Sequence, residues 1–124
     1  KIIEIPGSGN YSIQPISIND VVKVFLQSLD QIKFKNKIID LVGPDYLTFE
    51  QYVKLFSKDT KTKIKKINLE NAYYDAITNS NSNFGVDDLN ILIGDFKGNY
   101  NKLQKITQMK FESVMELLKS GRLL

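Results

Sequence analysis

The sequence predicts an α+β fold in which short strands are combined with about five helices. Two patterns indicate this class. Apolar residues recur at helical spacing behind capping residues, and short β-branched runs stand between turn residues. With 42% apolar and 25% charged residues in a chain of 124, the composition is typical of a globular protein and argues against disorder and against a coiled coil. We therefore expect residues 1–124 to form a single domain.

The first part of the chain predicts two strands joined by a tight turn. Lys1–Ile5 is rich in β-branched residues, and Tyr11–Ile16 runs back after the turn Pro6–Asn10. Two glycines in this turn are free to take the positive φ that other residues avoid. A helix then begins with Ser17 as N-cap and Asp20 three residues on, a variant of the capping box. The apolar face of this helix is formed by Val21, Val22, Phe25, Leu26 and Leu29.

The middle of the chain predicts a further strand followed by a helix. Ile38–Val42 is a β-branched run that ends at a Gly-Pro stop, which is typical of a mostly buried strand. Thr48 and Gln51 form a capping box, from which a helix runs to about Lys58.

The last part of the chain predicts one strand and three helices. We expect a strand at Lys63–Leu69, a helix at Asn71–Thr78 and a loop rich in Ser and Asn at Asn79–Gly85. Apolar residues at helical spacing mark two further helices, Val86–Phe96 and Phe111–Leu118, the second of which ends at a Ser-Gly pair. The phenylalanines expected in the core are Phe25, Phe49, Phe56 and Phe111.

Composition restricts the chemistry that the chain can perform. The absence of Cys and His excludes a disulfide framework, a thiolate metal site and an imidazole base, and no metal-binding spacing occurs. The net charge is +3, but all cations except Arg122 are Lys, whereas phosphate recognition prefers Arg. We therefore expect no metal and no nucleic-acid partner. No signal peptide and no apolar run of ~20 residues occurs, so we expect a cytoplasmic protein without a membrane partner.

Two clusters of charge have both a structural and a functional interpretation. The first could bind an anion or a nucleic acid, but it lacks Arg and a stacking aromatic, which favours a solvated face. Its members are Lys58, Lys61, Lys63, Lys65 and Lys66. The second, Asp87 and Asp88, resembles a catalytic or metal-binding pair, but adjacent helical residues point in different directions and acids favour a first helical turn. We interpret this pair as a helix start.

The most specific motifs are Q-P-I-S-I-N-D-V-V at Gln14–Val22 and I-I-D-L-V-G-P-D-Y-L-T-F-E at Ile38–Glu50. Their order and spacing resemble the C-terminal part of extended or atypical short-chain dehydrogenase/reductases of the NAD-dependent epimerase/dehydratase type. The NmrA-like branch, which includes an accessory subunit of respiratory complex I, is most similar. Pro6–Asn10 also resembles the P-G-x-G-N turn of these proteins. The resemblance covers roughly Ile3 to Lys58.

The resemblance implies a C-terminal, substrate-side domain, with NAD or NADP held by the protein's own N-terminal Rossmann domain. No G-x-G-x-x-G and no Tyr-x-x-x-Lys occurs here, so we assign no catalytic and no cofactor-binding residue and expect no cofactor in this chain itself. By family analogy, Gln14, Pro15 and Ser17 contact a small-molecule substrate. The structural alternative is that Ser17 caps a helix and that Gln14-Pro15 fixes the end of a strand. Ile13 stands where sugar-nucleotide epimerases usually carry a diphosphate-binding Arg, which favours the NmrA-like branch.

Two classes of function stay open at this point. The parent protein is either an NAD(P)-dependent oxidoreductase or sugar-nucleotide epimerase-like enzyme, or a non-catalytic protein–protein interaction or scaffold module of the NmrA-like type. The chain alone is not expected to be an enzyme. If Ile38–Val42 is a strand whose sheet neighbours lie in the Rossmann domain, its exposed edge, guarded only by Asp40, predicts a homodimer or pairing with the chain's own short strands.

Overall fold

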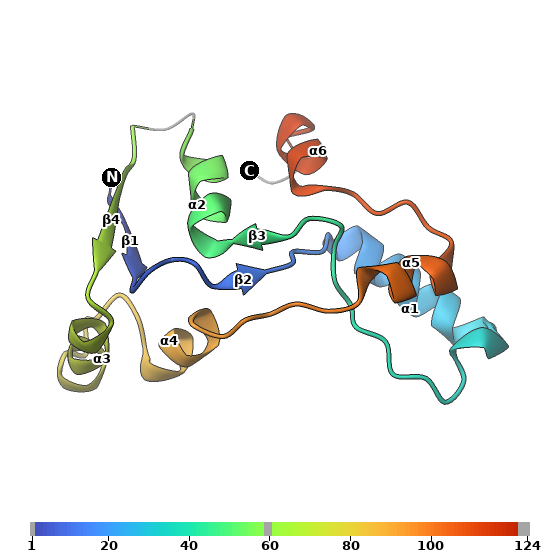
Figure 1. Cartoon of the computed structure of the whole chain (residues 1–124), viewed down its shortest axis with the longest axis horizontal. Coiled ribbons are helices and arrows are strands. Elements are labelled where there is room, and N and C mark those ends of the chain that lie inside the picture. The colour runs from blue at the N-terminus through green and yellow to red at the C-terminus, as the bar shows by residue number, and fades with distance from the viewer. Residues whose placement is uncertain (1, 59–60, 122–124) are drawn as a thin grey trace. The chain divides into compact units, whose positions relative to one another are not determined.

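The computed structural model describes residues 2–58 and 61–121. The described chain is a mixed α+β structure with six α-helices and four short strands, which confirms the coarse fold class. The elements, shown in Figure 1, are β1 (Ile2–Pro6), β2 (Ser12–Ile13), α1 (Ile18–Asp30), the 3-10 helix η1 (Ile32–Phe34), β3 (Leu47–Thr48), α2 (Phe49–Ser57), β4 (Lys63–Ile67), α3 (Leu69–Thr78), α4 (Val86–Leu92), α5 (Tyr100–Thr107) and α6 (Val114–Lys119).

The chain divides into two compact units, and each combines two separate stretches of sequence. Unit 1 consists of Lys1–Ile13 and Leu47–Phe96, and unit 2 consists of Gln14–Tyr46 and Lys97–Leu124. Because the two stretches of each unit alternate along the chain, this division does not separate two successive domains. The expectation of a single domain stays a prediction.

Unit 1 is built around a parallel pair of strands. β1 and β4 lie side by side in Figure 1, in a register that runs from Ile2 opposite Lys63 to Pro6 opposite Ile67. The turn after β1 takes the predicted form, with φ of 67° at Gly7 and 72° at Gly9. The buried apolar residues of this unit are Ile5, Val53, Ala72 and Leu89.

The capping box predicted for α2 is confirmed, whereas α3 begins two residues earlier than predicted, at Leu69. Thr48 and Gln51 make the reciprocal bonds of a capping box, and α2 ends at Ser57. Asn68 caps α3 and accepts a hydrogen bond from the Asn71 amide, so the strand stops at Ile67. The strand predicted over Tyr11–Ile16 is also shorter than expected, because only Ser12 and Ile13 pair with β3.

Unit 2 is helical in its described residues. Its core is the cluster of Val24, Leu103 and Phe111, which come from α1, α5 and the segment before α6. Partly buried residues complete the cluster, namely Ile16, Phe34, Ile39, Tyr100 and Met109. The ring of Tyr100 meets that of Phe111 edge-on, with 5.6 Å between the centroids.

The predicted strand Ile38–Val42 is wrong. These residues form no strand, and their polar groups bond to α5 and its start: Asp40 Oδ2 accepts from the Asn99 amide at 2.9 Å, and the Ile38 carbonyl accepts from Lys102 Nζ at 2.8 Å. A β-branched run becomes a strand only when a neighbouring backbone supplies the ladder. The described residues offer this segment no such neighbour.

Three helix predictions also need correction. α5 was not predicted, because Leu103 is its only fully buried apolar residue and the rest of the helix is largely polar. The helix predicted to reach Phe96 ends at Leu92, and the last helix starts at Val114 behind the capping box of Ser113. Phe111 is buried as predicted, whereas Phe25 is 58% exposed, and Phe49 and Phe56 are partly buried.

No helix among the described residues combines the length and the apolar character needed to cross a lipid bilayer.

Candidate functional site

Gln14, the first residue of the predicted substrate site, uses both ends of its side-chain amide on backbone groups of unit 2. Its Nε2 donates to the Gly43 carbonyl at 3.0 Å, and its Oε1 accepts from the Gly98 amide at 2.9 Å. The backbone of Gln14 also accepts a hydrogen bond from the Gly43 amide at 3.3 Å. Gln14 therefore joins three stretches of chain that lie far apart in the sequence.

Pro15 gives a physical reason for the glycine within the second motif, Gly43. A Cβ atom at Gly43 would fall onto the Pro15 carbonyl oxygen, so no larger residue fits without a movement of the backbone. The residues that carry the family resemblance in the two motifs therefore meet in space. We name Gln14, Pro15, Gly43 and Gly98 the Gln14 clasp.

Ser17 is the N-cap of α1, as its structural interpretation predicts. Its Oγ accepts from the Asp20 amide at 3.1 Å and donates to Glu112 Oε2 at 3.2 Å. The Asp20 carboxylate does not complete a capping box. It is fully buried, accepts from the Glu112 amide at 2.7 Å and from Lys23 Nζ at 3.3 Å, and so ties α1 to the segment before α6.

These contacts explain Gln14 and Ser17 by the architecture of unit 2. A side chain with two backbone partners is held in one orientation and offers few free hydrogen-bonding positions to a ligand. The substrate contacts of Gln14, Pro15 and Ser17 stay a prediction.

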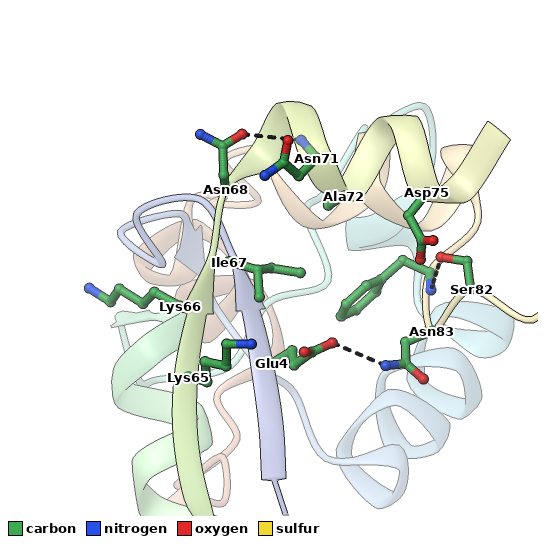
Figure 2. A pocket seen from close by; sticks show the side chains of 11 residues that line it. Glu4, Lys65, Lys66, Ile67, Asn68, Asn71, Ala72, Asp75, Ser82 and Asn83 are labelled. Carbon is green, nitrogen blue, oxygen red and sulfur yellow. Dashed lines mark hydrogen bonds between the residues drawn. The ribbon is translucent and has the colours of Figure 1, made fainter. Parts of the chain in front are cut away.

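A second candidate site is a hollow in unit 1, of about 360 Å³, which Figure 2 shows from close by. It lies between the two parallel strands, α3 and the loop that follows α3. The hollow is lined by Glu4, Lys65, Lys66, Ile67, Asn68, Asn71, Ala72, Asp75, Ser82, Asn83 and Phe84. Because side chains alternate along a strand, Lys65 and Ile67 point to the hollow, whereas Lys66 points away from it (Figure 2).

The polar groups of the hollow are held in place by their neighbours. Glu4 Oε2 accepts from Asn83 Nδ2 at 3.0 Å. Hydrogen bonds from Asn79 and Ser82 hold the pKa of Asp75 below its usual value, so this carboxylate stays charged at neutral pH. The hollow therefore offers fixed carboxylate acceptors beside one ammonium donor, that of Lys65. Such a mixed lining suits a small polar molecule with several hydroxyl or amino groups.

The lysine cluster consists entirely of exposed residues, in agreement with the solvated face favoured from the sequence. Lys66 pairs with Glu50 of α2 at 2.7 Å, and Lys54 pairs with the same carboxylate at 2.7 Å. Hydrogen bonds from Lys54 and Lys66 lower the pKa of Glu50 to about 2. Lys66 is thus part of an ion-pair network, whereas Lys65 turns its side chain to the hollow (Figure 2).

Asp87 and Asp88 stand in the first turn of α4, as predicted for a helix start. Asp88 Oδ2 accepts from the Gly85 amide at 2.8 Å. Within residues 2–58 and 61–121, no group of three or more His, Cys, Asp or Glu side chains is arranged to hold a metal ion. Arg122 lies outside these ranges.

The sequence patterns did not predict most of the residues that line the hollow. Glu4, Asn71 and Asp75 are ordinary polar residues of a strand and a helix, and only the parallel pairing of β1 with β4 brings them to one place. A usable signal was the Ser- and Asn-rich loop after α3, which contributes Ser82 and Asn83 to the lining.

Comparison with known proteins found no matching family model, no matching curated protein and no matching solved structure.

Proposed function

We propose that this chain is the substrate-side domain of a cytoplasmic NAD(P)-dependent reductase or epimerase-like protein. In this proposal, a Rossmann domain outside these residues holds the dinucleotide, and the chain closes over it and selects the small molecule that reaches the nicotinamide. NAD or NADP supplies the hydride chemistry. The chain's own residues bind and orient the substrate.

The Gln14 clasp is the observation that carries this proposal. The resemblance rests on two short motifs separated by about twenty residues, and either motif alone has little specificity. The contacts of Gln14 and Pro15 with Gly43 give the two motifs a shared physical reason, because the Gln-Pro pair requires a glycine opposite it. A chance coincidence of two motifs would not require contact between them.

The hollow in unit 1 is the surface that we assign to the substrate in this proposal. Its carboxylate, amide and ammonium groups offer both acceptors and donors, and Ile67 and Ala72 add apolar contact. A small molecule that carries several hydroxyl or amino groups matches this lining.

Dinucleotide binding tests the proposal. We expect calorimetric titration of the 124-residue chain with NADH and NADPH to show no binding, because it carries no Gly-rich phosphate loop at a helix N-terminus. A longer protein in which a Rossmann domain precedes these residues should bind one of the two cofactors in the micromolar range. Micromolar binding by the chain alone, or no binding by the longer protein, contradicts the proposal.

A second candidate function is a non-catalytic interaction module. The observation that favours it is the exposed apolar side of α1, where Leu29 is 77% exposed. A measurement of NAD(P)-dependent turnover separates the enzyme from the interaction module. A longer protein that binds NAD(P)H and oxidises or reduces a substrate supports the enzyme, whereas tight cofactor binding without turnover supports the interaction module.

A further inference from the structure

α1 carries a continuous apolar stripe on the side that does not face the core of its own unit. Four residues follow one another at spacings of four, three and four positions, and a fifth lies beside them. They are Ile18, Val22, Phe25 and Leu29, with Leu26 as the fifth. Each of these side chains is at least half exposed. We name these five residues the α1 seam.

The opposite side of α1 is buried and different in character. Asp20 and Val24 are the buried residues of the helix, and Val24 belongs to the core cluster of unit 2. α1 therefore has two faces: the inner face is used by unit 2, and the outer face is the α1 seam.

The spacing of the α1 seam indicates what kind of surface covers it. Alternating steps of three and four residues are the heptad spacing with which one helix packs along another. A continuous apolar stripe on an exposed helix marks an interaction surface, because apolar residues that are exposed singly do not follow a regular spacing. A second helix is the element whose surface matches the α1 seam.

We propose that two copies of the chain associate through the α1 seam, with their α1 helices antiparallel. No charged residue lies on the α1 seam, so nothing on it repels a second copy. Two charges of the helix, Lys23 and Asp30, stand seven residues apart on one flank, and the Lys23 ammonium also pairs with Asp20 of its own copy at 3.3 Å. In an antiparallel pair with two-fold symmetry, this flank meets its own counterpart, and Lys23 of each copy approaches Asp30 of the other. A parallel pair offers no such match.

The area of the α1 seam fits a weak dimer. Its five side chains are each at least half exposed and expose on the order of 500 Å² per copy, so the pair buries at most about 1,000 Å², near the lower limit for a specific interface. Beside Phe25 lies a hollow of about 300 Å³, lined also by Val24, Phe34 and Ile39, which has room for a side chain of the second copy. We therefore expect a dissociation constant in the micromolar range.

This interface replaces the one expected from the sequence. The homodimer argued from Ile38–Val42 required a strand edge that these residues do not form, and Ile39 packs on the core cluster of unit 2. The substitution Ile39→Lys therefore damages that cluster and does not report on association. The proposed dimer is independent of the cofactor chemistry, and its test leaves the dinucleotide experiment unaffected.

Sedimentation equilibrium of the whole 124-residue chain tests the dimer. Leu29→Lys places a charge on the part of the α1 seam that overlaps when Lys23 lies opposite Asp30, and Ile77→Lys on α3 is the matched control, because the two side chains are 77% and 72% exposed. We expect Leu29→Lys to weaken association at least tenfold and Ile77→Lys to leave it unchanged, with circular dichroism showing that both variants are folded. A wild-type chain that stays monomeric at about 0.5 mM, or equal effects of the two variants, overturns the proposal.

Single cysteines test the antiparallel arrangement, since the chain contains no native Cys. Leu26 lies near the middle of α1, and Ile18 is its first residue. In the proposed pair, Leu26→Cys meets its own counterpart and forms a disulfide when a mild oxidant such as diamide takes up the two thiol hydrogens. Ile18→Cys stays uncrosslinked. Crosslinking of Ile18→Cys, with or without that of Leu26→Cys, or crosslinking of neither variant, overturns the antiparallel arrangement.

Discussion

Unit 1 and unit 2 connect distant parts of the chain by different kinds of hydrogen bond. In unit 1, the backbone ladder between β1 and β4 joins residues about sixty positions apart. Among the described residues of unit 2 there is no strand, and side chains make most of the long-range connections there, whereas unit 1 adds to its ladder a bond of this kind, from the Ser12 amide to Asp95 at 2.8 Å. In unit 2, side-chain oxygens accept from distant backbone amides, in the pairs Gln14 with Gly98 (2.9 Å), Asp20 with Glu112 (2.7 Å), Asp40 with Asn99 (2.9 Å) and Asp45 with Val114 (2.6 Å).

This difference has a physical reason and a consequence. Backbone amides inside a fold need acceptors, and a carboxylate makes a shorter and stronger bond to an amide than a neutral acceptor does. A ladder spreads its bonds over the backbone, so a change of one side chain leaves it intact. In unit 2 most of the long-range connections depend on one side chain each, so we expect single substitutions of these side chains to cost more.

The largest effect on stability is expected from the substitution Asp20→Ala in unit 2. This substitution leaves the Glu112 amide without its acceptor and empties a fully buried position, so the free energy of unfolding should fall by about 2–4 kcal/mol. Urea denaturation followed by circular dichroism measures the loss. The control is Asp30→Ala, because Asp30 lies exposed at the end of the same helix and should cost less than about 0.5 kcal/mol. Equal costs would show that the bond from the Glu112 amide to Asp20 contributes nothing to stability.

A smaller effect is expected from Ser17→Ala, which removes the N-cap of α1. The Asp20 amide loses its acceptor and Glu112 loses a donor, so the free energy of unfolding should fall by roughly 0.5–2 kcal/mol. Ser28→Ala in the same helix is the control, since its hydroxyl only bonds back to the Phe25 carbonyl. An unchanged denaturation midpoint for Ser17→Ala would mean that the cap contributes nothing to stability.

The smallest effect is expected in unit 1, from the titration of Glu50. Lys54 and Lys66 lower the pKa of Glu50 from 4.5 to about 2, so its ion pairs stabilise the fold fully above about pH 4.5 and are lost as the pH falls towards 2. Because the groups lie at the surface, the change should be slight and should weaken further in salt. An NMR titration of the Glu50 carboxyl measures the pKa. Glu50→Gln should flatten this part of the stability profile, and a pKa near 4.5 in the wild-type chain would contradict the ion-pair network.

Some of the site could be predicted from the sequence because it depends on neighbours along the chain. Ser17 and Thr48 were predicted as caps, and each accepts from the amide three residues on. Such bonds need only the local turn of the backbone. The partners of Gln14 could not be predicted in the same way, because Gly43 and Gly98 reach it from distant parts of the chain.

The exposure of Phe25 shows the same limit for burial. The helical spacing of Val22, Phe25 and Leu29 correctly predicts that they share one face of α1, but spacing does not say which face meets the core. Asp20 and Val24 occupy the buried face instead, because the carboxylate finds the Glu112 amide there and Val24 packs with Leu103 and Phe111.

A comparison of two β-branched segments shows what the sequence determined and what the tertiary structure decided. Ile38–Val42 is the more apolar of the two and Lys63–Ile67 the more charged, yet only the second is a strand. Residue type determined that both segments favour an extended backbone. The tertiary structure decided which of them pairs, because a strand exists only where a second backbone accepts and donates along its whole length. β1 offers such a backbone to Lys63–Ile67, whereas Ile38–Val42 meets the side chain of Lys102 and the amide of Asn99.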